Sequence, residues 1–271
     1  MGQQKVHLTG ERATLLATLY GRALDARSRH PILGDKLAAE TIDHIDYDFS
    51  KTGISPAIAP AVALRAHSVD DWAAEYLAEH PEAVVLHLGC GLDTRYHRMA
   101  VPPGVRWYDV DYPEVIDLRA RLFPRPPGYT MIGSSVTDLA WLDQVPDDAP
   151  ALVVAEGLFY YLDPAEGARL LRAIVDRFPR GQFVFDALST LGLRLQRFNG
   201  PVRKAGATMH WAIDGPADLL AIHPKLRCVS ALSAFDAAGF GTLSLPYRIM
   251  FWLAELLPSL KRTAVIYRLE F

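Results

Sequence analysis

The chain has 271 residues, of which half are hydrophobic and 22% are charged, so it can bury one large core. Its formal net charge of −3 gives no basic face of the kind that grips nucleic acid. The two cysteines, Cys90 and Cys228, are too few for a disulfide framework or a zinc site, and no metal is expected. The N-terminus lacks an apolar run of signal-peptide length, and charges break the longer apolar stretches. We therefore expect a cytoplasmic protein that binds neither nucleic acid nor a membrane.

The first 80 residues have the pattern of helices. Apolar residues recur at helical spacing over residues 15–24, and a His-Pro pair at 30–31 ends the run. A shorter helix is predicted at 37–44, and a longer one begins at a Ser-Pro pair and spans residues 55–80. We expect residues 1–80 to form a helical N-terminal cap or lid.

From residue 83 onward, short apolar runs alternate with helix-like stretches. These runs predict strands at residues 83–88, 105–110, 129–132, 151–155 and 182–187. Strands that alternate with helices favour a mostly parallel sheet covered on both faces. The chain from residue 81 to its end is therefore predicted to be a Rossmann-like α/β domain.

The last part of the chain is less regular. Residues 226–231 and 264–271 predict two more strands, with helices at 233–238 and 247–257 between them. Because the chain closes on a strand, we expect that strand to be added, antiparallel, at the edge of the sheet. Residues 191–214 fit no regular pattern and follow the fifth strand, where open α/β sheets carry substrate loops, so we expect an acceptor-side insertion there.

One motif indicates a cofactor. The apolar strand at residues 84–88 runs straight into Gly89 and Gly91, which permit a tight turn and a close approach of the backbone to a ligand. Asp111 lies 22 residues after Gly89 (111 − 89), close to the spacing of a carboxylate that binds a ribose. Thr94 replaces the third glycine that a pyrophosphate requires. The motif therefore favours S-adenosylmethionine, a nucleoside cofactor without phosphates, over NAD.

Longer strings of residues carry a family resemblance. Residues 88–95 (Leu-Gly-Cys-Gly-Leu-Asp-Thr-Arg), 109–115 (Asp-Val-Asp-Tyr-Pro-Glu-Val) and 155–162 (Ala-Glu-Gly-Leu-Phe-Tyr-Tyr-Leu) resemble the leucine carboxyl methyltransferase family, which includes polyketide-pathway O-methyltransferases. Arg65 and the segment 134–142 also match. The resemblance implies a class I methyltransferase sheet and an S-adenosylmethionine site.

The resemblance also implies a role for individual residues. It places Arg65 at the methionine carboxylate, Gly89 and Gly91 under the cofactor, Asp111 at the ribose hydroxyls, Asp138 and Leu139 beside adenine, and Glu156 beneath the methionine ammonium group. On the acceptor side, Tyr161 matches a family tyrosine. His210 is a candidate base, and the alternative is a packed, hydrogen-bonded histidine with a structural role.

Taken together, these features predict an S-adenosylmethionine-dependent O-methyltransferase. Its expected partner is a small, polyketide-like molecule that accepts the methyl group on a carboxylate or phenol oxygen. The sequence has no clear histidine–carboxylate pair, which favours a carboxylate because a carboxylate is already ionised at neutral pH. Four basic residues of the insertion either meet an anionic acceptor or are solvated: Arg194, Arg197, Arg203 and Lys204. The alternatives are a protein C-terminal carboxyl methyltransferase, an NAD-dependent oxidoreductase and a non-catalytic cofactor-binding protein.

Overall fold

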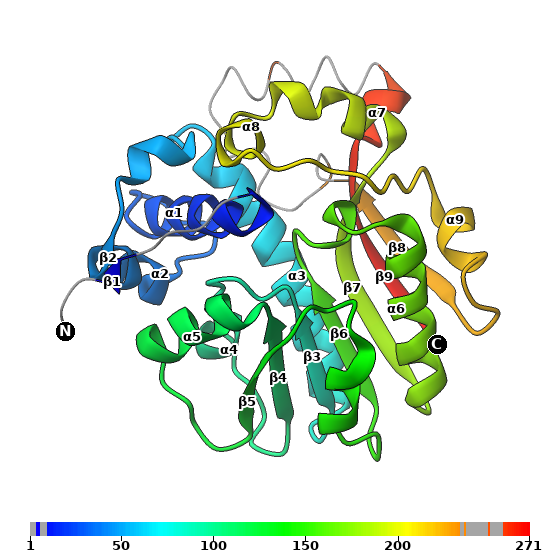
Figure 1. Ribbon diagram of the computed structural model, residues 1–271. Helices are drawn as coiled ribbons and strands as arrows, with labels where there is room; N and C mark the ends of the chain where they lie inside the picture. The colour runs from blue at the N-terminus through cyan, green and yellow to red at the C-terminus, as the bar shows by residue number, and fades with distance from the viewer. Residues whose placement is uncertain (1–3, 6–9, 234–235, 237–248, 250–256) are drawn as a thin grey trace.

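A seven-stranded sheet forms the centre of the molecule (Figure 1). The computed structural model describes residues 4–5, 10–233, 236, 249 and 257–271, and the helices expected at 233–238 and 247–257 fall mainly outside these residues. The strand order is β5-β4-β3-β6-β7-β9-β8. The strands are β3 (Val84–Leu88), β4 (Arg106–Asp111), β5 (Tyr129–Gly133), β6 (Ala151–Ala155), β7 (Gly181–Leu188), β8 (Arg227–Ser233) and β9 (Ala264–Glu270).

Five neighbouring strands are parallel, which confirms the predicted α/β class. The last strand of the chain, β9, is antiparallel to both of its neighbours, β7 and β8. The sequence placed β9 at the edge, but the structure inserts it one position inward, and β8 forms the edge. The burial of the two strands explains this order, because β8 alternates exposed and half-buried residues whereas Ile266, Tyr267 and Leu269 of β9 are buried.

The central strands are buried on both faces, as expected for a parallel sheet. On one face, Val84 and Leu86 of β3 join a core that includes Leu170 and Ile174 of helix α6 (Pro164–Arg177). On the other face, Val85 joins a core that includes residues of helix α3 (Ala59–Glu79). Figure 1 shows α6 and α3 on opposite sides of the sheet.

The N-terminal helices lie beside the sheet. Helices α1 (Thr14–Ala26), α2 (Lys36–Thr41) and α5 (Pro113–Leu122) share a third apolar core. Helix α3 belongs to the expected cap but contacts β6, β7 and β9, so it connects the cap to the sheet. A two-residue strand β1 (Gln4–Lys5) pairs with β2 (Ile45–Asp46) at the outer side of the cap.

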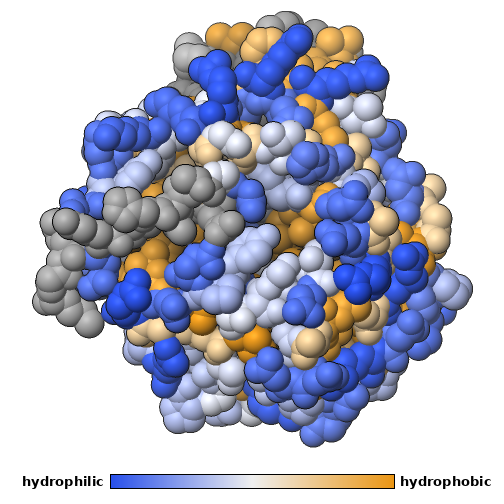
Figure 2. Space-filling model, in the orientation of Figure 1, coloured by the Kyte–Doolittle hydropathy of each residue, from blue (hydrophilic) through white to orange (hydrophobic). Residues whose placement is uncertain are grey.

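The insertion after β7 is folded. It forms α7 (Thr190–Arg194), η6 (Leu195–Phe198) and α8 (Gly200–Ala205) above the carboxyl ends of the strands (Figure 1). Helix α8 contacts α1, η1 (Gly10–Ala13) and η3 (Phe49–Thr52), so the insertion and the cap meet over the sheet. Figure 2, in the orientation of Figure 1, shows apolar surface in a hollow at the centre of the face turned to the viewer.

The remaining described elements are short. They are η2 (Ile42–His44), α4 (Arg95–Arg98), η4 (Leu139–Gln144), η5 (Phe159–Tyr161), α9 (Pro216–Leu220) and α11 (Pro258–Lys261). Among the helices of the described residues, none is long and apolar enough to cross a membrane.

Candidate active site

A cavity of about 710 Å³ opens at the carboxyl ends of the parallel strands. The loops after β3, β4, β5, β6 and β7 line it from the sheet, and residues of the cap and the insertion line it from the opposite side. Strand order reverses between β3 and β6, where ligands of open α/β sheets bind. The volume of the cavity is within the range of small-molecule binding sites.

The glycine loop after β3 forms one wall. Gly89 and Gly91 have φ angles of +60° and +49°, which residues with a Cβ rarely adopt. A Cβ on Gly89 would lie 2.9 Å from a methyl carbon of Leu158, and one on Gly91 would lie 3.1 Å from Cβ of Leu15. The loop thus requires glycine at both positions, for its backbone angles and for the space that its neighbours occupy.

Asp111 fixes this loop at the end of β4. Its Oδ2 accepts a hydrogen bond from the backbone N–H of Gly91 at 2.7 Å, and its Oδ1 accepts one from Tyr112 N–H at 2.7 Å. Burial raises the pKa of Asp111 in spite of these hydrogen bonds. Each carboxylate oxygen can accept a second bond, so Asp111 can hold a hydroxyl in the cavity as well as the loop.

Glu156, which follows β6, lies between two arginines. Its Oε1 accepts from Nε of Arg65 at 3.0 Å, and its Oε2 accepts from Nη2 of Arg95 at 2.6 Å. Its side chain is 4% exposed, and burial opposes its charge, but the two guanidinium groups hold the pKa of Glu156 below its usual range. Glu156 is therefore a fixed, ionised carboxylate in the wall of the cavity.

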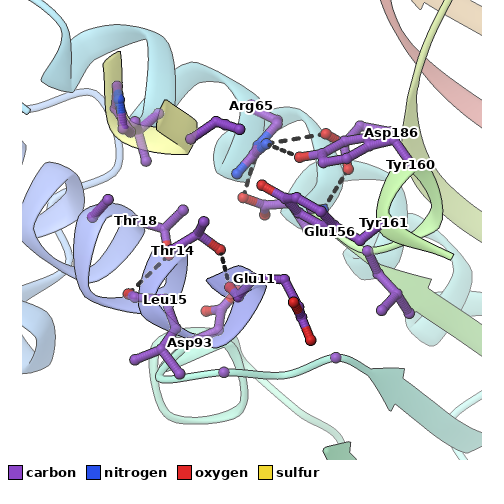
Figure 3. A pocket seen from close by; sticks show the side chains of 18 of the residues that line it. Glu11, Thr14, Leu15, Thr18, Arg65, Asp93, Glu156, Tyr160, Tyr161 and Asp186 are labelled. Carbon is purple, nitrogen blue, oxygen red and sulfur yellow. Dashed lines mark hydrogen bonds and ion pairs between the residues drawn. The ribbon is translucent and has the colours of Figure 1, made fainter. Parts of the chain in front are cut away.

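Arg65 projects from α3 across the carboxyl end of the sheet (Figure 3). Besides Glu156, its guanidinium donates to Asp186, at the end of β7, at 3.0 Å and to the Tyr160 hydroxyl at 3.2 Å. Burial raises the pKa of Asp186, and Arg65 partly offsets that effect. These contacts connect α3 to the ends of β6 and β7 and hold Arg65 in one orientation.

Behind Glu156 the ion pairs continue into the protein. Arg95 is fully buried and also pairs with Asp70 at 2.5 Å and with Asp93 at 3.2 Å. Arg98 pairs with the same two aspartates, at 2.6 Å and 2.5 Å. Four arginine–carboxylate contacts of this length, all partly or fully buried, make the floor of the site rigid, because breaking a buried pair costs about 3–5 kcal/mol.

His87 lies under the glycine loop, on β3. Its Nδ1 is 2.8 Å from Oδ1 of Asp109, which also accepts from Nε1 of Trp107 and contacts Arg119 and Tyr129. Arg119 in turn donates to the backbone carbonyls of Gly91 and Asp93. The buried charges under the loop therefore also support its backbone.

Apolar and aromatic side chains make up much of the lining outside the glycine loop, beside the polar side chains of Glu11, Thr14, Thr18 and Asn199, and we call the apolar set the acceptor half. Its lining is drawn from α3 and the segment before it, from η5, β7, the insertion and β9, with one strongly exposed aromatic side chain, Phe198 (70% exposed). The residues of the acceptor half are Ile54, Ile58, Ala61, Val62, Tyr160, Tyr161, Leu162, Leu188, Phe198, Val202, Met209 and Val265.

Most of the residues expected from the sequence do line the cavity. They are Arg65, Gly89, Gly91, Asp111, Glu156 and Tyr161. Asp138 instead accepts a hydrogen bond from Ala140 N–H at the start of η4, and Leu139 packs against the core, so neither is among the lining residues. His210 is exposed and also outside the lining; its backbone N–H donates to the Tyr160 carbonyl at 2.7 Å.

The basic residues of the insertion are solvated. Arg194, Arg197, Arg203 and Lys204 are all exposed and none lines the cavity. Sequence reasoning missed Arg22 on α1 and Asp186 near the end of β7, and within the matching segment 134–142 it singled out Asp138 and Leu139 and not Ser134–Val136. Asp186 lies near the end of a buried strand, and Glu156 directly follows one. This shared position is the feature of the sequence that could have identified Asp186 as a site residue.

A sheet of this order, with a glycine loop and a ribose-spaced carboxylate at its switch point, defines the class I methyltransferase fold. A structure from Thermobifida fusca described as a candidate methyltransferase superposes with a TM-score of 0.57 over 92% of both chains, at 19% identity. The family model for leucine carboxyl methyltransferase matches residues 15–175. The chain belongs to the leucine carboxyl methyltransferase family.

Two relatives agree with this placement. The chain is 48% identical to the tetracenomycin polyketide synthesis O-methyltransferase TcmP of Streptomyces glaucescens, over 86% of this chain and 87% of that one. It is 36% identical to the S-adenosyl-L-methionine-dependent methyltransferase dpfgK of Gibberella zeae, over 82% of both chains. The protein is an S-adenosylmethionine-dependent methyltransferase, as the sequence predicted, and the NAD-dependent alternative is wrong.

The residues of the cavity fit this cofactor. S-adenosylmethionine carries a ribose, an ammonium group and a carboxylate, and the cavity offers the carboxylates of Asp111 and Glu156 and the guanidinium group of Arg65. Ser135 and Val136 supply a polar and an apolar surface beside Asp111, where a base can lie.

Proposed function

We propose that the protein methylates an oxygen atom of a small, apolar, aromatic molecule of the polyketide type. The observation that carries this proposal is the acceptor half, whose apolar and aromatic lining suits a flat hydrophobic molecule. TcmP, the relative at 48% identity, is named as an O-methyltransferase of tetracenomycin polyketide synthesis. An apolar pocket of this kind suits a small molecule better than the C-terminus of a protein, whose backbone is polar throughout.

For the cofactor we propose the following placement. Asp111 binds the ribose hydroxyls, Gly89 and Gly91 lie under the methionine half, Glu156 faces the ammonium group and Arg65 faces the carboxylate. Adenine lies against Ser135 and Val136 and not against Asp138 and Leu139, since only the first pair lines the cavity.

The cofactor supplies a methyl group on a sulfonium, which an acceptor oxygen displaces in line. The chain must align the acceptor with that methyl group and exclude water, and positioning of this kind supplies much of the rate. Tyr161 faces the acceptor half, and burial raises its pKa to about 12. At neutral pH its hydroxyl is therefore protonated, so it orients the acceptor by donating a hydrogen bond and does not act as a base.

We favour a carboxylate over a phenol as the acceptor group. His210, the expected base, is exposed and outside the lining. Contrary to the sequence expectation, the fold does form a histidine–carboxylate pair at the cavity, His87 with Asp109 at 2.8 Å, but His87 is only 2% exposed and lies under the glycine loop. A phenol with a pKa near 10 needs a base at neutral pH, whereas a carboxylate does not.

The test is a screen for adenosylhomocysteine release with matched pairs of aromatic polyketide-like acceptors that carry either a free carboxyl or a free phenol, the other group being blocked. We expect turnover of the free carboxylic acids. Tyr161→Phe should lower turnover about tenfold with unchanged affinity for adenosylhomocysteine. Turnover of the phenols alone would overturn the choice of group, and release with neither set would overturn the proposed acceptor class.

We also propose that the cap (residues 1–80) and the insertion (residues 191–214) together act as a lid. The contacts of α8 with α1 and η1 support this proposal, since all three contribute residues to the lining of the cavity. Hydrogen exchange should show added protection in both segments when adenosylhomocysteine and an acceptor bind. Protection confined to residues 89–111 would refute the lid.

A further inference from the structure

Phe198, at the end of η6, is a large apolar side chain that the fold leaves in contact with solvent. Its exposed fraction is 70%, the highest among the large apolar side chains of the described residues. Of the large apolar side chains that these residues expose, it is also the one that lines the cavity. Tyr160, Val202 and Met209 line the same half but pack together in a buried cluster. They therefore form the inner wall of the acceptor half, and Phe198 lies at its mouth.

The backbone on both sides of Phe198 is tied to that inner wall. Before it, the side-chain amide of Gln196 donates to the Met209 carbonyl at 3.2 Å and accepts from the Met209 N–H at 2.9 Å. After it, the side chain of Asn199 accepts from the Val202 N–H at 3.2 Å and so caps α8. The Asn199 N–H also donates to the Gln196 carbonyl at 2.8 Å. These contacts of its neighbours set the place of the exposed ring at the mouth.

One face of the Phe198 ring is already covered. The guanidinium carbon of Arg197 lies over the ring, 4.8 Å from its centroid, which is within the range of a cation–π contact. The exposure of Phe198 therefore falls on the opposite face and on the ring edges. Exposed aromatic surface is unfavourable in water, and a flat aromatic ligand can cover it by offset stacking.

We propose that Phe198 is a specificity-determining residue, whose open face stacks on the outer ring of an acceptor with several fused rings. This inference rests on the proposed function, an aromatic acceptor in the acceptor half. The cavity of about 710 Å³ holds the cofactor as well as the acceptor, and the cofactor takes the part beside the glycine loop in the proposed placement. A single-ring acceptor that reaches the methyl group lies against the inner wall. An acceptor of several fused rings extends from there to the mouth, where it meets Phe198.

The test measures how tightly aromatic acids of increasing length bind to the full-length protein saturated with adenosylhomocysteine, so its readout does not depend on turnover. Benzoic acid, 2-naphthoic acid and anthracene-2-carboxylic acid carry one, two and three fused rings. Equilibrium dialysis measures their affinities for the parent protein, for Phe198→Ala and for the matched control Leu220→Ala. Leu220, on α9, also exposes an apolar side chain but does not line the cavity.

We expect a loss that grows with the length of the acid. Phe198→Ala should weaken the three-ring acid about 10- to 30-fold and benzoic acid less than about threefold. Its affinity for adenosylhomocysteine, measured by calorimetry, should be unchanged, and Leu220→Ala should change none of these affinities. Equal losses for benzoic acid and the three-ring acid, or no loss, in Phe198→Ala would overturn the inference.

Two further variants separate stacking from simple apolar contact. Phe198→Trp keeps an aromatic face and should keep the preference for the three-ring acid, whereas Phe198→Leu is apolar without a ring and should lose most of that preference. A Phe198→Leu protein with the parent's preference would refute stacking. If the parent protein binds adenosylhomocysteine but none of the three acids, the proposed acceptor class is itself wrong, and the role of Phe198 falls with it.

Discussion

Gly91→Ala tests whether the contact between α1 and the glycine loop matters for cofactor binding. Gly91 has a φ of +49°, and an alanine there would occupy the left-handed region at a cost of about 1–2 kcal/mol. Its Cβ would also lie 3.1 Å from Cβ of Leu15, so α1 or the loop must shift, and overpacking of this kind costs about 1–3 kcal/mol. We expect a total loss of unfolding free energy of about 2–5 kcal/mol.

Gly206→Ala is the matched control. Gly206 has a φ of +67°, but a Cβ there would meet no heavy atom within 4 Å, and it does not line the cavity. This variant should lose only the backbone contribution, about 1–2 kcal/mol. Urea denaturation measures both losses, and calorimetry with adenosylhomocysteine measures the effect on the site, where we expect Gly91→Ala alone to weaken binding about tenfold or more. Equal stability and equal affinity in the two variants would refute the reasoning.

Three further predictions concern the charged wall of the cavity and the core. Glu156→Gln should weaken adenosylhomocysteine about 10- to 100-fold, because it removes one charge-assisted bond, whereas methylthioadenosine, which lacks the ammonium group, should bind almost unchanged in calorimetry. The folded-state pKa values of Asp93 and Glu156 are lowered, so their stabilisation is present above about pH 4.5 and is lost as pH falls through those lowered values. Urea midpoints should accordingly fall between about pH 5 and 3, and a flat profile would contradict this. Gly167→Ala should lower the melting temperature by several degrees, because its Cβ would lie 2.0 Å from the ring of Trp211; an unchanged value would show that the ring moves freely.

The rigid floor of the site explains why a methyltransferase buries so many charges. Arg65, Arg95 and Glu156 come from α3, α4 and the end of β6, and their contacts fix these elements relative to one another. Pre-set donors and acceptors need not reorganise when a charged ligand binds. The cost of burying the charges is offset only because each one has a partner.

Local sequence was enough to predict most of the fold. The five parallel strands were recognisable because buried strands are short apolar runs, and the helices between them because their apolar residues recur at helical spacing. The position of β9 was not recognisable. Pairing order depends on which strand edges are left open in three dimensions, and the burial that distinguishes β9 from the edge strand β8 is known only once the sheet is assembled.

The same division applies to the site. The residues that sequence placed correctly in the cavity, such as Gly89, Gly91 and Asp111, belong to one strand–loop–strand unit, where chain spacing fixes geometry. Glu156 could be named because a carboxylate that ends a buried strand needs a partner. The identity of that partner, however, depends on how α3 and α4 pack.

Only the tertiary structure brought Arg22 and Asp186 to the same cavity, 164 residues apart in the chain (186 − 22). No hydrophobic periodicity of the sequence relates positions so far apart. An arginine on an amphipathic helix is expected to be exposed to solvent until the fold shows that it is buried. The sequence by itself determined the elements and the cofactor loop, because these follow from local backbone preferences and apolar periodicity. The tertiary structure decided which charges pair, because pairing depends on distances across the fold that chain separation does not encode.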